Sequence, residues 1–208
     1  MTKLVLFDID GVIIRHKEYF SDTLSEDRYN NPGLILNRLY KSENNKKCDK
    51  GELDFFEYIK SFLDQIAWDK SIEDYLNLQY EFESHYIDIS LIERIKRIRN
   101  NDIKTGIASN QNQYRKIFLL KKLDIVNVFD DYYFSSDIGY VKSEKEFWEY
   151  VIKNLKSKYK WLKNEDIIFL DDLVENTKKA KEFGIDSYLI KSKKDIEEVL
   201  RKIEEKVV

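Results

Sequence analysis

Short apolar runs alternate with helical stretches along most of this chain, and that alternation restricts its fold more than any other feature. Five runs are rich in β-forming residues: Lys3–Phe7, Ile103–Ala108, Asp131–Phe134, Asp166–Leu170 and Asp186–Ile190. Continuous apolar runs of this length are typical of strands that are buried on both faces. Strands that alternate with helices favour a parallel sheet with right-handed crossovers. The sequence therefore predicts an α/β fold.

Helical patterns fill the segments between these runs. Ser90 and Glu93 have the spacing of a capping box, and Ser143 and Glu146 have the spacing of a second one. Gly184 is expected to be the glycine that follows a helix end. The expected helices are Ser90–Arg99, Gln113–Leu123, a helix from Ser143 through Leu155, Leu173–Phe183 and Lys193–Val207.

The stretch from Lys17 to Tyr86 departs from the alternation because it contains helical patterns only. The helices expected there are Glu18–Arg28, Leu34–Asn44, Glu52–Ala67 and Ile72–His85, with turn residues at 30–33 and 49–51. We therefore expect a small helical domain over residues 16–86, inserted into an α/β core made of residues 1–15 and 87–208.

Composition excludes several classes of protein. The net charge of −3 supplies no basic excess for a phosphate backbone, so nucleic acid is not an expected partner. Cys48 is the only cysteine, which excludes an internal disulfide, and with His16 and His85 it makes too small a set for a structural zinc site. No apolar run approaches 18 residues, so we expect no membrane partner and a cytoplasmic protein. A monomer is the default expectation.

Polar residues follow four of the predicted strands or stand in the loops just beyond them. They are Asp8, Asp10, Ser109, Asn110, Lys142, Asp171, Asp172 and Asn176. Taken singly, such residues commonly end strands or cap helices. Together they mark the edge of an open α/β sheet at which ligands bind. Several carboxylates, a hydroxyl, an amide and one lysine suit Mg²⁺ and a phosphate dianion. The glycine-rich nucleotide loops and the nucleophile elbow of serine hydrolases are absent from the sequence.

These motifs, in this order, resemble those of the haloacid dehalogenase (HAD) superfamily of phosphohydrolases. The matching segments are Phe7–Val12 (FDIDGV), Ala108–Asn110 (ASN), Lys142 and Phe169–Ile185. The family often has proline after its lysine, where this chain has Ser143. The resemblance implies a Rossmann-like parallel sheet, and it identifies the helical insert as a cap similar to that of the branch acting on small sugar phosphates.

The resemblance also implies the chemistry of the site. Asp8 is the expected nucleophile and forms an aspartyl-phosphate that water then hydrolyses. Asp10 is the expected acid and base, with a pKa raised by the surrounding anions. Lys142 is expected to neutralise charge on Asp8 and the phosphate, while Ser109 and Asn110 hold phosphate oxygens.

The expected cofactor is Mg²⁺. By the same resemblance, its ligands are the carboxylates of Asp8 and Asp172 and the main-chain carbonyl of Asp10, with Asp171 and Asn176 supporting them from behind.

The leading hypothesis is a Mg²⁺-dependent phosphatase acting on a small phosphorylated metabolite, a sugar phosphate or a nucleotide monophosphate. A sugar phosphomutase of the same superfamily, a non-catalytic binding protein and a phosphoacceptor signalling domain are the alternatives; the last ranks lowest because that class lacks a helical insert. Most aromatic residues of the cap are expected to form its own core. The Lys50–Gly51 turn is a candidate to face the site, and His16 either lines its entrance or is exposed.

Overall fold

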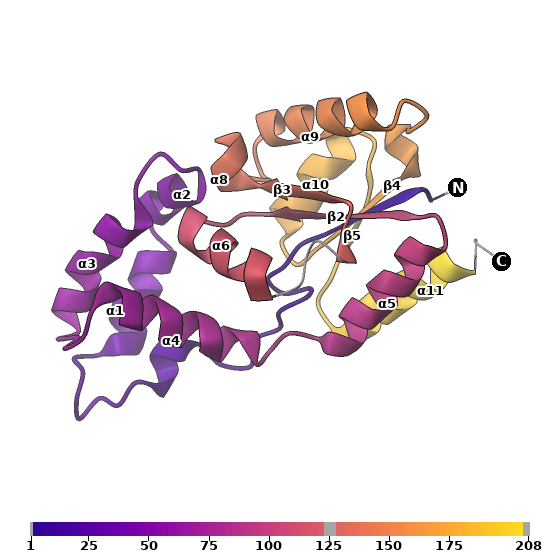
Figure 1. The fold of residues 1–208 in the computed structure, drawn as a ribbon. Helices are drawn as coiled ribbons and strands as arrows, with labels where there is room; N and C mark the ends of the chain where they lie inside the picture. Colours follow the sequence, from indigo (N-terminus) through magenta and orange to yellow (C-terminus); the bar gives the residue numbers. More distant parts are fainter. Residues whose placement is uncertain (1, 123–127, 206–208) are drawn as a thin grey trace.

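A five-stranded parallel sheet forms the centre of the molecule in the computed structural model, which describes residues 2–122 and 128–205. The strands are β1 (Leu4–Phe7), β2 (Lys104–Ser109), β3 (Asp131–Phe134), β4 (Ile167–Asp171) and β5 (Asp186–Leu189). Their order is β3-β2-β1-β4-β5, and every neighbouring pair is parallel (Figure 1). The predicted parallel α/β sheet is confirmed, and each predicted strand lies within one residue of an observed one.

Strand β1 lies at the middle of the sheet and shows how the core is divided. Val5 and Phe7 point to one face and Leu4 and Leu6 to the other, as the two-residue repeat of a strand requires. The first face is covered by α5 (Ile89–Asn100) and α11 (Lys193–Glu204). The second is covered by α9 (Lys145–Lys158) and α10 (Val174–Glu182). Burial on both faces explains why the strand sequences are continuously apolar.

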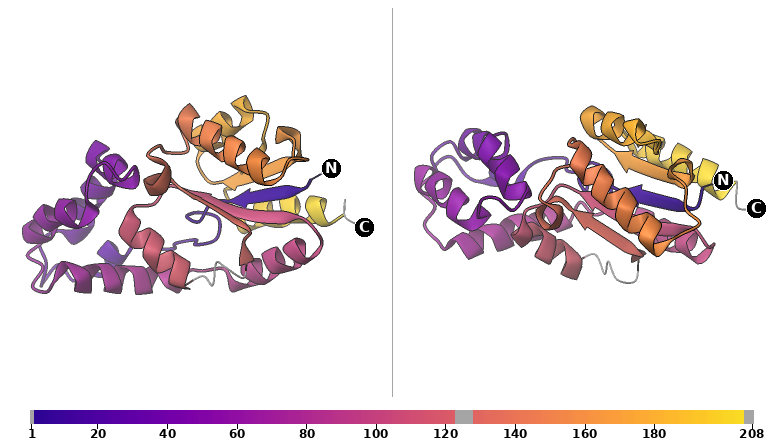
Figure 2. Two further views of the ribbon diagram at one scale, coloured as in Figure 1. Left: turned by 45° about the horizontal axis from the view of Figure 1, so that its top comes forward. Right: turned by 90° about the horizontal axis from the view of Figure 1, so that it is seen from above.

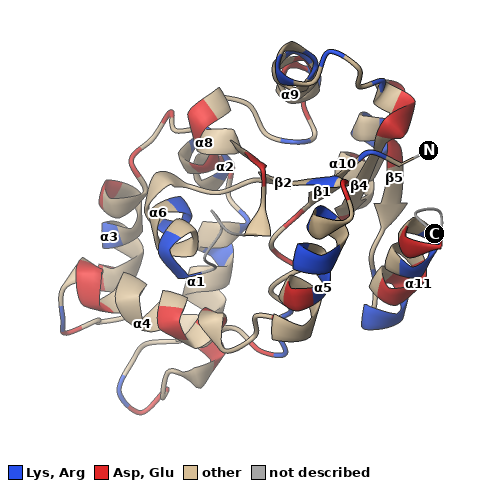
Figure 3. Cartoon of the chain, turned by 45° about the vertical axis from the view of Figure 1, so that its right-hand side comes forward, with Lys and Arg blue, Asp and Glu red and all other residues tan. Residues whose placement is uncertain are grey.

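Charged residues of both signs occupy the outer sides of the covering helices. Figure 3 shows segments of Lys or Arg and segments of Asp or Glu alternating along α5 and α11. The inner sides of the same helices carry the apolar residues that pack on the sheet, such as Ile95 and Leu200. Among residues 2–122 and 128–205, no helix has the length and hydropathy needed to cross a bilayer.

The helical insert, called the cap below, packs around its own apolar cluster. Its helices are α1 (Pro32–Tyr40), α2 (Glu43–Asp49), α3 (Phe55–Gln65) and α4 (Ile72–Ser84), preceded by the short 3-10 helix η1 (Phe20–Thr23). Aromatic residues contribute strongly to that cluster, as expected, with Phe55, Tyr75 and Tyr80 buried. Figures 1 and 2 show the cap beyond the edge of the sheet at which the strands end.

Two predicted cap helices are wrong. In the stretch predicted as helix Glu18–Arg28, the helix that forms is η1, and it ends after Thr23 because Leu24 is extended, with a ψ of 125°. The predicted helix Leu34–Asn44 is broken after Tyr40. Ser42 is extended there, and its hydroxyl accepts the N–H of Asn45, so a second helix begins at Glu43.

Two predicted helix caps in the core are also wrong. Helix α5 begins at Ile89 because Asp88, not Ser90, accepts the N–H of Leu91; the Ser90 hydroxyl donates to that same carboxylate. Helix α9 begins at Lys145, after an extended Glu144, so Ser143 does not cap it. The prediction for Gly184 is confirmed, since it follows α10 with a φ of +76°.

The remaining predicted helix ends meet the limits of the described chain. Helix α6 is described over Gln113–Lys122, and its predicted last residue, Leu123, lies outside the described residues. Helix α11 ends at Glu204, and the predicted end at Val207 is likewise outside them.

Two adjacent chain segments join the cap to the core. Ile14 forms an antiparallel bridge with Ile87, the N–H of Arg15 donates to the carbonyl of Tyr86 at 3.2 Å, and the N–H of Asp88 donates to Ile13 at 2.9 Å. The outgoing and returning segments are therefore tied together at the point where the first motif ends. This hinge fixes the position of the residues that follow Asp10.

Candidate active site

Asp8 lies at the carboxyl end of β1, the central strand, and is almost completely buried. Its backbone N–H continues the sheet by donating to Leu170 at 2.9 Å, and one carboxylate oxygen accepts the N–H of Ile9 at 2.7 Å. The other oxygen is 2.6 Å from Nζ of Lys142. Because β2 and β4 flank β1, residues at the ends of three strands meet around this carboxylate.

Lys142 is a buried ammonium held between two carboxylates. Its Nζ is 2.6 Å from Asp8 and donates to Asp171, also at 2.6 Å. Its backbone is fixed as well, since its N–H donates to Oδ1 of Asn110 and its carbonyl accepts the indole N–H of Trp148. Burial alone would lower the pKa of Lys142, but Asp171 and Asp8 raise it above its ordinary value. The residue therefore remains a fixed positive charge.

Asp171 and Asp172 place two further carboxylates beside Asp8. Each of the three offers an oxygen, and these oxygens lie within 4.8 Å of one another. Asp171 has its oxygens engaged by Lys142, by the N–H of Leu173 and by the amide of Asn176, at 2.6 to 3.1 Å. Asn176 thus supports Asp171, in the position expected from the sequence.

The charge balance at this point favours a bound cation. Burial raises the pKa of Asp8, and Asp171 adds to the rise while Lys142 opposes it. Burial and then Asp171 raise the pKa of Asp172. One ammonium does not compensate three close carboxylates, and a divalent cation would.

The oxygen donors and the space beside them fit Mg²⁺. Gly11 has a φ of +73°, and a Cβ at that position would lie 2.3 Å from Cγ of Asp172. The loop after β1 can therefore approach Asp172 closely only because residue 11 has no side chain.

Asp10 is placed differently from the prediction, and the expected rise of its pKa is wrong. Arg115 grips its carboxylate with two nitrogens, at 2.5 and 2.7 Å, while Gln111 donates to it at 2.8 Å and Nε2 of His16 lies 3.6 Å away. Burial would raise the pKa of the Asp10 carboxyl, but Arg115 and His16 hold it well below its usual range. In this structure Asp10 is a carboxylate.

Sequence reasoning missed Arg115 and Gln111. Gln111 lies in the loop after β2 and Arg115 in the first turn of α6, and both side chains donate to Asp10. Arg115 also reaches the cap, where its Nε donates to Glu83 of α4 at 2.8 Å. The positions of the two residues after Ser109 were visible in the sequence, but the sequence did not show that both side chains bind Asp10.

Ser109 and Asn110 end β2 next to these groups. Ser109 is buried, and its hydroxyl accepts a hydrogen bond from Gln111 at 3.1 Å. Asn110 binds the backbone of Lys142, as described above. The structure thus brings all eight predicted site residues to one edge of the sheet; the phosphate-binding role of Ser109 and Asn110 stays a prediction.

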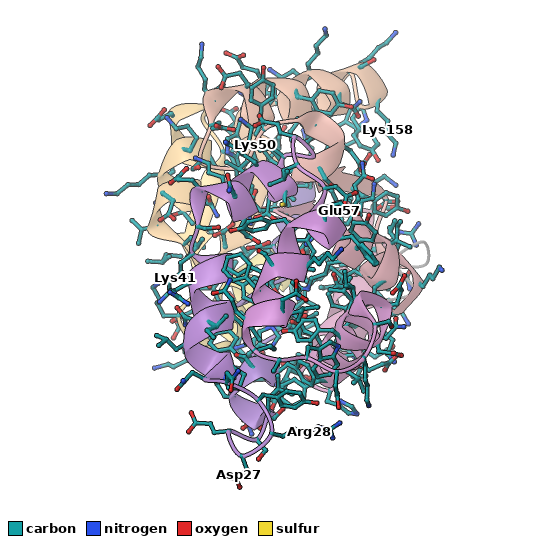
Figure 4. The ribbon with its side chains drawn as sticks, turned by 90° about the vertical axis from the view of Figure 1, so that its left-hand side faces the viewer. Asp27, Arg28, Lys41, Lys50, Glu57 and Lys158 are labelled. Carbon is teal, nitrogen blue, oxygen red and sulfur yellow. The ribbon has the colours of Figure 1, made fainter. Side chains whose placement is uncertain are left out.

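The Lys50–Gly51 turn of the cap contacts the core beside the loop that carries Lys142. Nζ of Lys50 is 3.5 Å from Glu144, and the hydroxyl of Ser135, in the short helix α8 (Ser135–Ile138), donates to the carbonyl of Asp49. Figure 4 shows Lys50 and Arg28 at opposite ends of the cap. The charge of Lys50 is therefore used in a contact between cap and core.

A cavity of about 1070 Å³ opens between the cap and the strand ends. Both domains contribute to its wall. Its lining includes Asp10, Arg15, His16, Asp49, Glu83, Arg115 and Asp172. His16 thus lines the entrance rather than standing away from the site. Burial raises the pKa of Asp49 to about 7.

The family model for haloacid dehalogenase-like hydrolases matches residues 2–184. The chain belongs to this family. The structure of a HAD family enzyme from Bacteroides thetaiotaomicron superposes with a TM-score of 0.76 at 18% identity, covering 96% of this chain and 98% of that one. The same enzyme in complex with magnesium and inorganic phosphate gives a TM-score of 0.70 at 18% identity, with 93% and 96% covered. A HAD-like family hydrolase from Porphyromonas gingivalis gives 0.62 at 16% identity, with 97% and 98% covered.

One curated relative is much longer than the segment that matches this chain. A drimenol cyclase from Aspergillus calidoustus is 26% identical to this HAD-like hydrolase over 114 residues, which is 55% of this chain and 21% of the fungal protein. The chain thus corresponds to about a fifth of that relative.

Proposed function

We propose that this HAD-like hydrolase is a Mg²⁺-dependent phosphatase that acts on a small phosphorylated metabolite through an aspartyl-phosphate on Asp8. One observation carries the proposal: the buried Asp8 carboxylate has an ammonium 2.6 Å away on Lys142 and two further carboxylates close by, on Asp171 and Asp172. This arrangement suits a nucleophile that must meet an anionic phosphate beside a divalent cation.

Asp10 favours phosphoryl transfer over dehalogenation. Displacement of a halide needs no proton donor two residues after the nucleophile, whereas an alkoxide leaving from phosphorus does. Asp10 borders the cavity, where a leaving group would lie. A HAD relative has also been crystallised with magnesium and inorganic phosphate, which is consistent with this chemistry.

In the first step, an oxygen of Asp8 attacks phosphorus while the bond to the leaving oxygen breaks, and that oxygen takes a proton from Asp10. In the second step, Asp10 takes a proton from the water that attacks the aspartyl-phosphate, which releases phosphate and restores Asp8. Arg115 holds Asp10 as a carboxylate, which is the state that the second step uses. The first step needs a proton on Asp10, so the hydrogen bonds from Arg115 to Asp10 have to weaken before that step.

The other residues supply charge and position. Lys142 offsets negative charge on Asp8 and on the phosphate, while Ser109 and Asn110 bind phosphate oxygens at the end of β2. When held by Asp8, Asp172 and the main-chain carbonyl of Asp10, Mg²⁺ supplies positive charge that reduces repulsion between nucleophile and substrate.

The test is a phosphate-release screen over metabolite phosphates and p-nitrophenyl phosphate, with and without Mg²⁺. Asp8→Asn should abolish release, and Asp10→Asn should slow it roughly a hundredfold. Asp64→Asn, at an exposed position of α3 in the cap, is the matched control and should match the wild type. Normal turnover by the Asp8→Asn protein would refute the proposal.

Product analysis separates the alternatives. Chloride released from 2-chloropropionate without phosphatase activity would indicate a dehalogenase. Conversion of one hexose phosphate into its isomer without free phosphate would indicate a phosphomutase. Absence of both turnover and Mg²⁺ binding in calorimetry would indicate a non-catalytic binding protein.

A further inference from the structure

Arg15 lines the cavity, and its side chain forms no hydrogen bond within the described residues. Its backbone is fixed by the hinge contact to Tyr86. Its guanidinium has no hydrogen bond or salt bridge there, and the buried nitrogen Nη1 has no partner. The other half-buried arginines, Arg94, Arg99 and Arg115, all pair with carboxylates.

The charge of Arg15 helps to lower the pKa of Asp195, but the carboxylate of Asp195 is bound by other groups. Oδ2 of Asp195 accepts the backbone N–H groups of Lys191 and Ser192, at 2.8 and 2.7 Å, which are among the main causes of its lowered pKa. Arg15 contributes to that lowering through its charge alone, without a hydrogen bond to Asp195. Arg15 therefore lines the cavity with a guanidinium that no carboxylate of the described residues pairs with.

His16, the next residue in the chain, also lines the cavity. Its ring packs near those of Tyr19 and Tyr86, with centroids 6.0 and 5.7 Å away. Nε2 is turned toward Asp10 at 3.6 Å, while the buried Nδ1 has no partner. His16 thus turns one nitrogen toward the proposed acid and buries the other without a partner.

Buried polar atoms without a partner, such as Nη1 of Arg15 and Nδ1 of His16, are rare because each forfeits its hydration. An arginine fork matches the two oxygens of a carboxylate or the oxygens of a phosphate, and such charge-assisted bonds are strong. The transferred phosphoryl group does not explain them. That group belongs with Asp8, Lys142 and Ser109, at the ends of β1 and β2 and in the loop before α9, whereas Arg15 comes from the hinge.

We propose that Arg15 and His16 form a subsite for a second oxyanion, carried by the leaving group of the substrate. The substrate class is then a phosphate monoester that also bears a carboxylate or another phosphate. This inference rests on the proposed phosphatase function and narrows it. It makes Arg15 a specificity-determining residue.

Three probes with related leaving groups test the subsite: glucose 6-phosphate, 6-phosphogluconate and glucose 1,6-bisphosphate. For at least one of the two probes whose leaving group carries a second oxyanion, the wild type should show a kcat/KM roughly 10- to 100-fold above that for glucose 6-phosphate, mainly through a lower KM. The carboxylate probe and the bisphosphate probe distinguish which oxyanion is preferred.

Variants assign the preference to Arg15. Arg15→Met should reduce the ratio of kcat/KM between the preferred probe and glucose 6-phosphate at least tenfold, and Arg15→Lys should restore part of it because the charge remains. Arg38→Met is the matched control, since Arg38 is exposed on α1 and does not line the cavity. The ratio is independent of any loss of total active protein.

The outcomes separate the two proposals. If the wild type hydrolyses p-nitrophenyl phosphate and glucose 6-phosphate but gains nothing from the second anion, the subsite is refuted and the phosphatase function stands. A preference that survives unchanged in Arg15→Met also refutes it. If no ester is hydrolysed with Mg²⁺ present, the proposed function itself fails.

Discussion

Removal of the Arg115 side chain should destabilise the fold strongly, because this residue separates two carboxylates. Its guanidinium contacts Asp10 at 2.5 and 2.7 Å and Glu83 at 2.8 Å, and its side chain is 11% exposed. Arg115→Met would leave both carboxylates without this cation. Removing one partner of a buried pair costs about 3–5 kcal/mol, and the 39% exposure of Asp10 favours the lower end, about 3 kcal/mol.

Thermal unfolding followed by circular dichroism measures this effect. In a chain of this size each kcal/mol corresponds to about 2–4 °C, so the midpoint of Arg115→Met should fall by roughly 6–12 °C. The double variant Arg115→Met/Glu83→Gln should recover part of the loss, because one of the two unpaired charges is removed as well.

An exposed pair of the same type is the control. Arg28 is 2.6 Å from Asp69 at the far end of the cap, and both side chains are more than half exposed (Figure 4). Arg28→Met should move the midpoint by less than about 2 °C, since solvent screens such pairs. If Arg115→Met behaves like Arg28→Met, or if Glu83→Gln recovers nothing, the burial argument is refuted.

Two further substitutions test other parts of the site. Gly11→Ala should weaken Mg²⁺ binding in calorimetry by roughly tenfold or more, because the added Cβ would displace Asp172. Gly139→Ala is the control, since Gly139 has a similar φ and a Cβ there would meet nothing within 4 Å. Equal effects of the two substitutions on Mg²⁺ binding would contradict this prediction. Burial raises the pKa of Asp49 to about 7. Above about pH 4 the folded chain therefore keeps a proton on Asp49 that the unfolded chain loses. The free energy of unfolding consequently falls as the pH rises toward 7. Asp49→Asn should therefore reduce the difference in unfolding free energy between pH 5 and pH 8 by about 2 kcal/mol in urea titrations; identical differences would show that the proton is not retained.

The sheet and the acidic cluster were predictable because they depend on patterns within short segments. The run Leu4–Phe7 is apolar at every position, which requires two covered faces, and helices occur on both sides of it in the sequence. Once the strands are parallel, Asp8 and Asp171 must lie at the same edge. Lys142 follows β3 after one short helix, so its side chain reaches the same edge of the sheet.

Helix starts were harder to predict because neighbouring side chains compete for the same backbone group. Ser90 has the right spacing for a cap, but Asp88 lies two residues earlier and accepts the N–H of Leu91. In the stretch after residue 17, Asp22 accepts the N–H of Tyr19 and caps a first turn, but the chain becomes extended at Leu24 and the helix ends after Thr23. Such choices depend on which side chain the tertiary structure leaves available.

The charge state of Asp10 was mispredicted for a physical reason that applies to the whole site. Counting the nearby acidic residues gives a raised pKa, but Arg115 arrives from 105 residues further along the chain and reverses the sign. The same guanidinium binds Glu83 on the cap. A movement of the cap that lengthens the contact to Glu83 therefore also changes the charge around Asp10. In the proposed mechanism the first step uses a proton on Asp10, so the contacts of Arg115 link that proton to both the cap and the core.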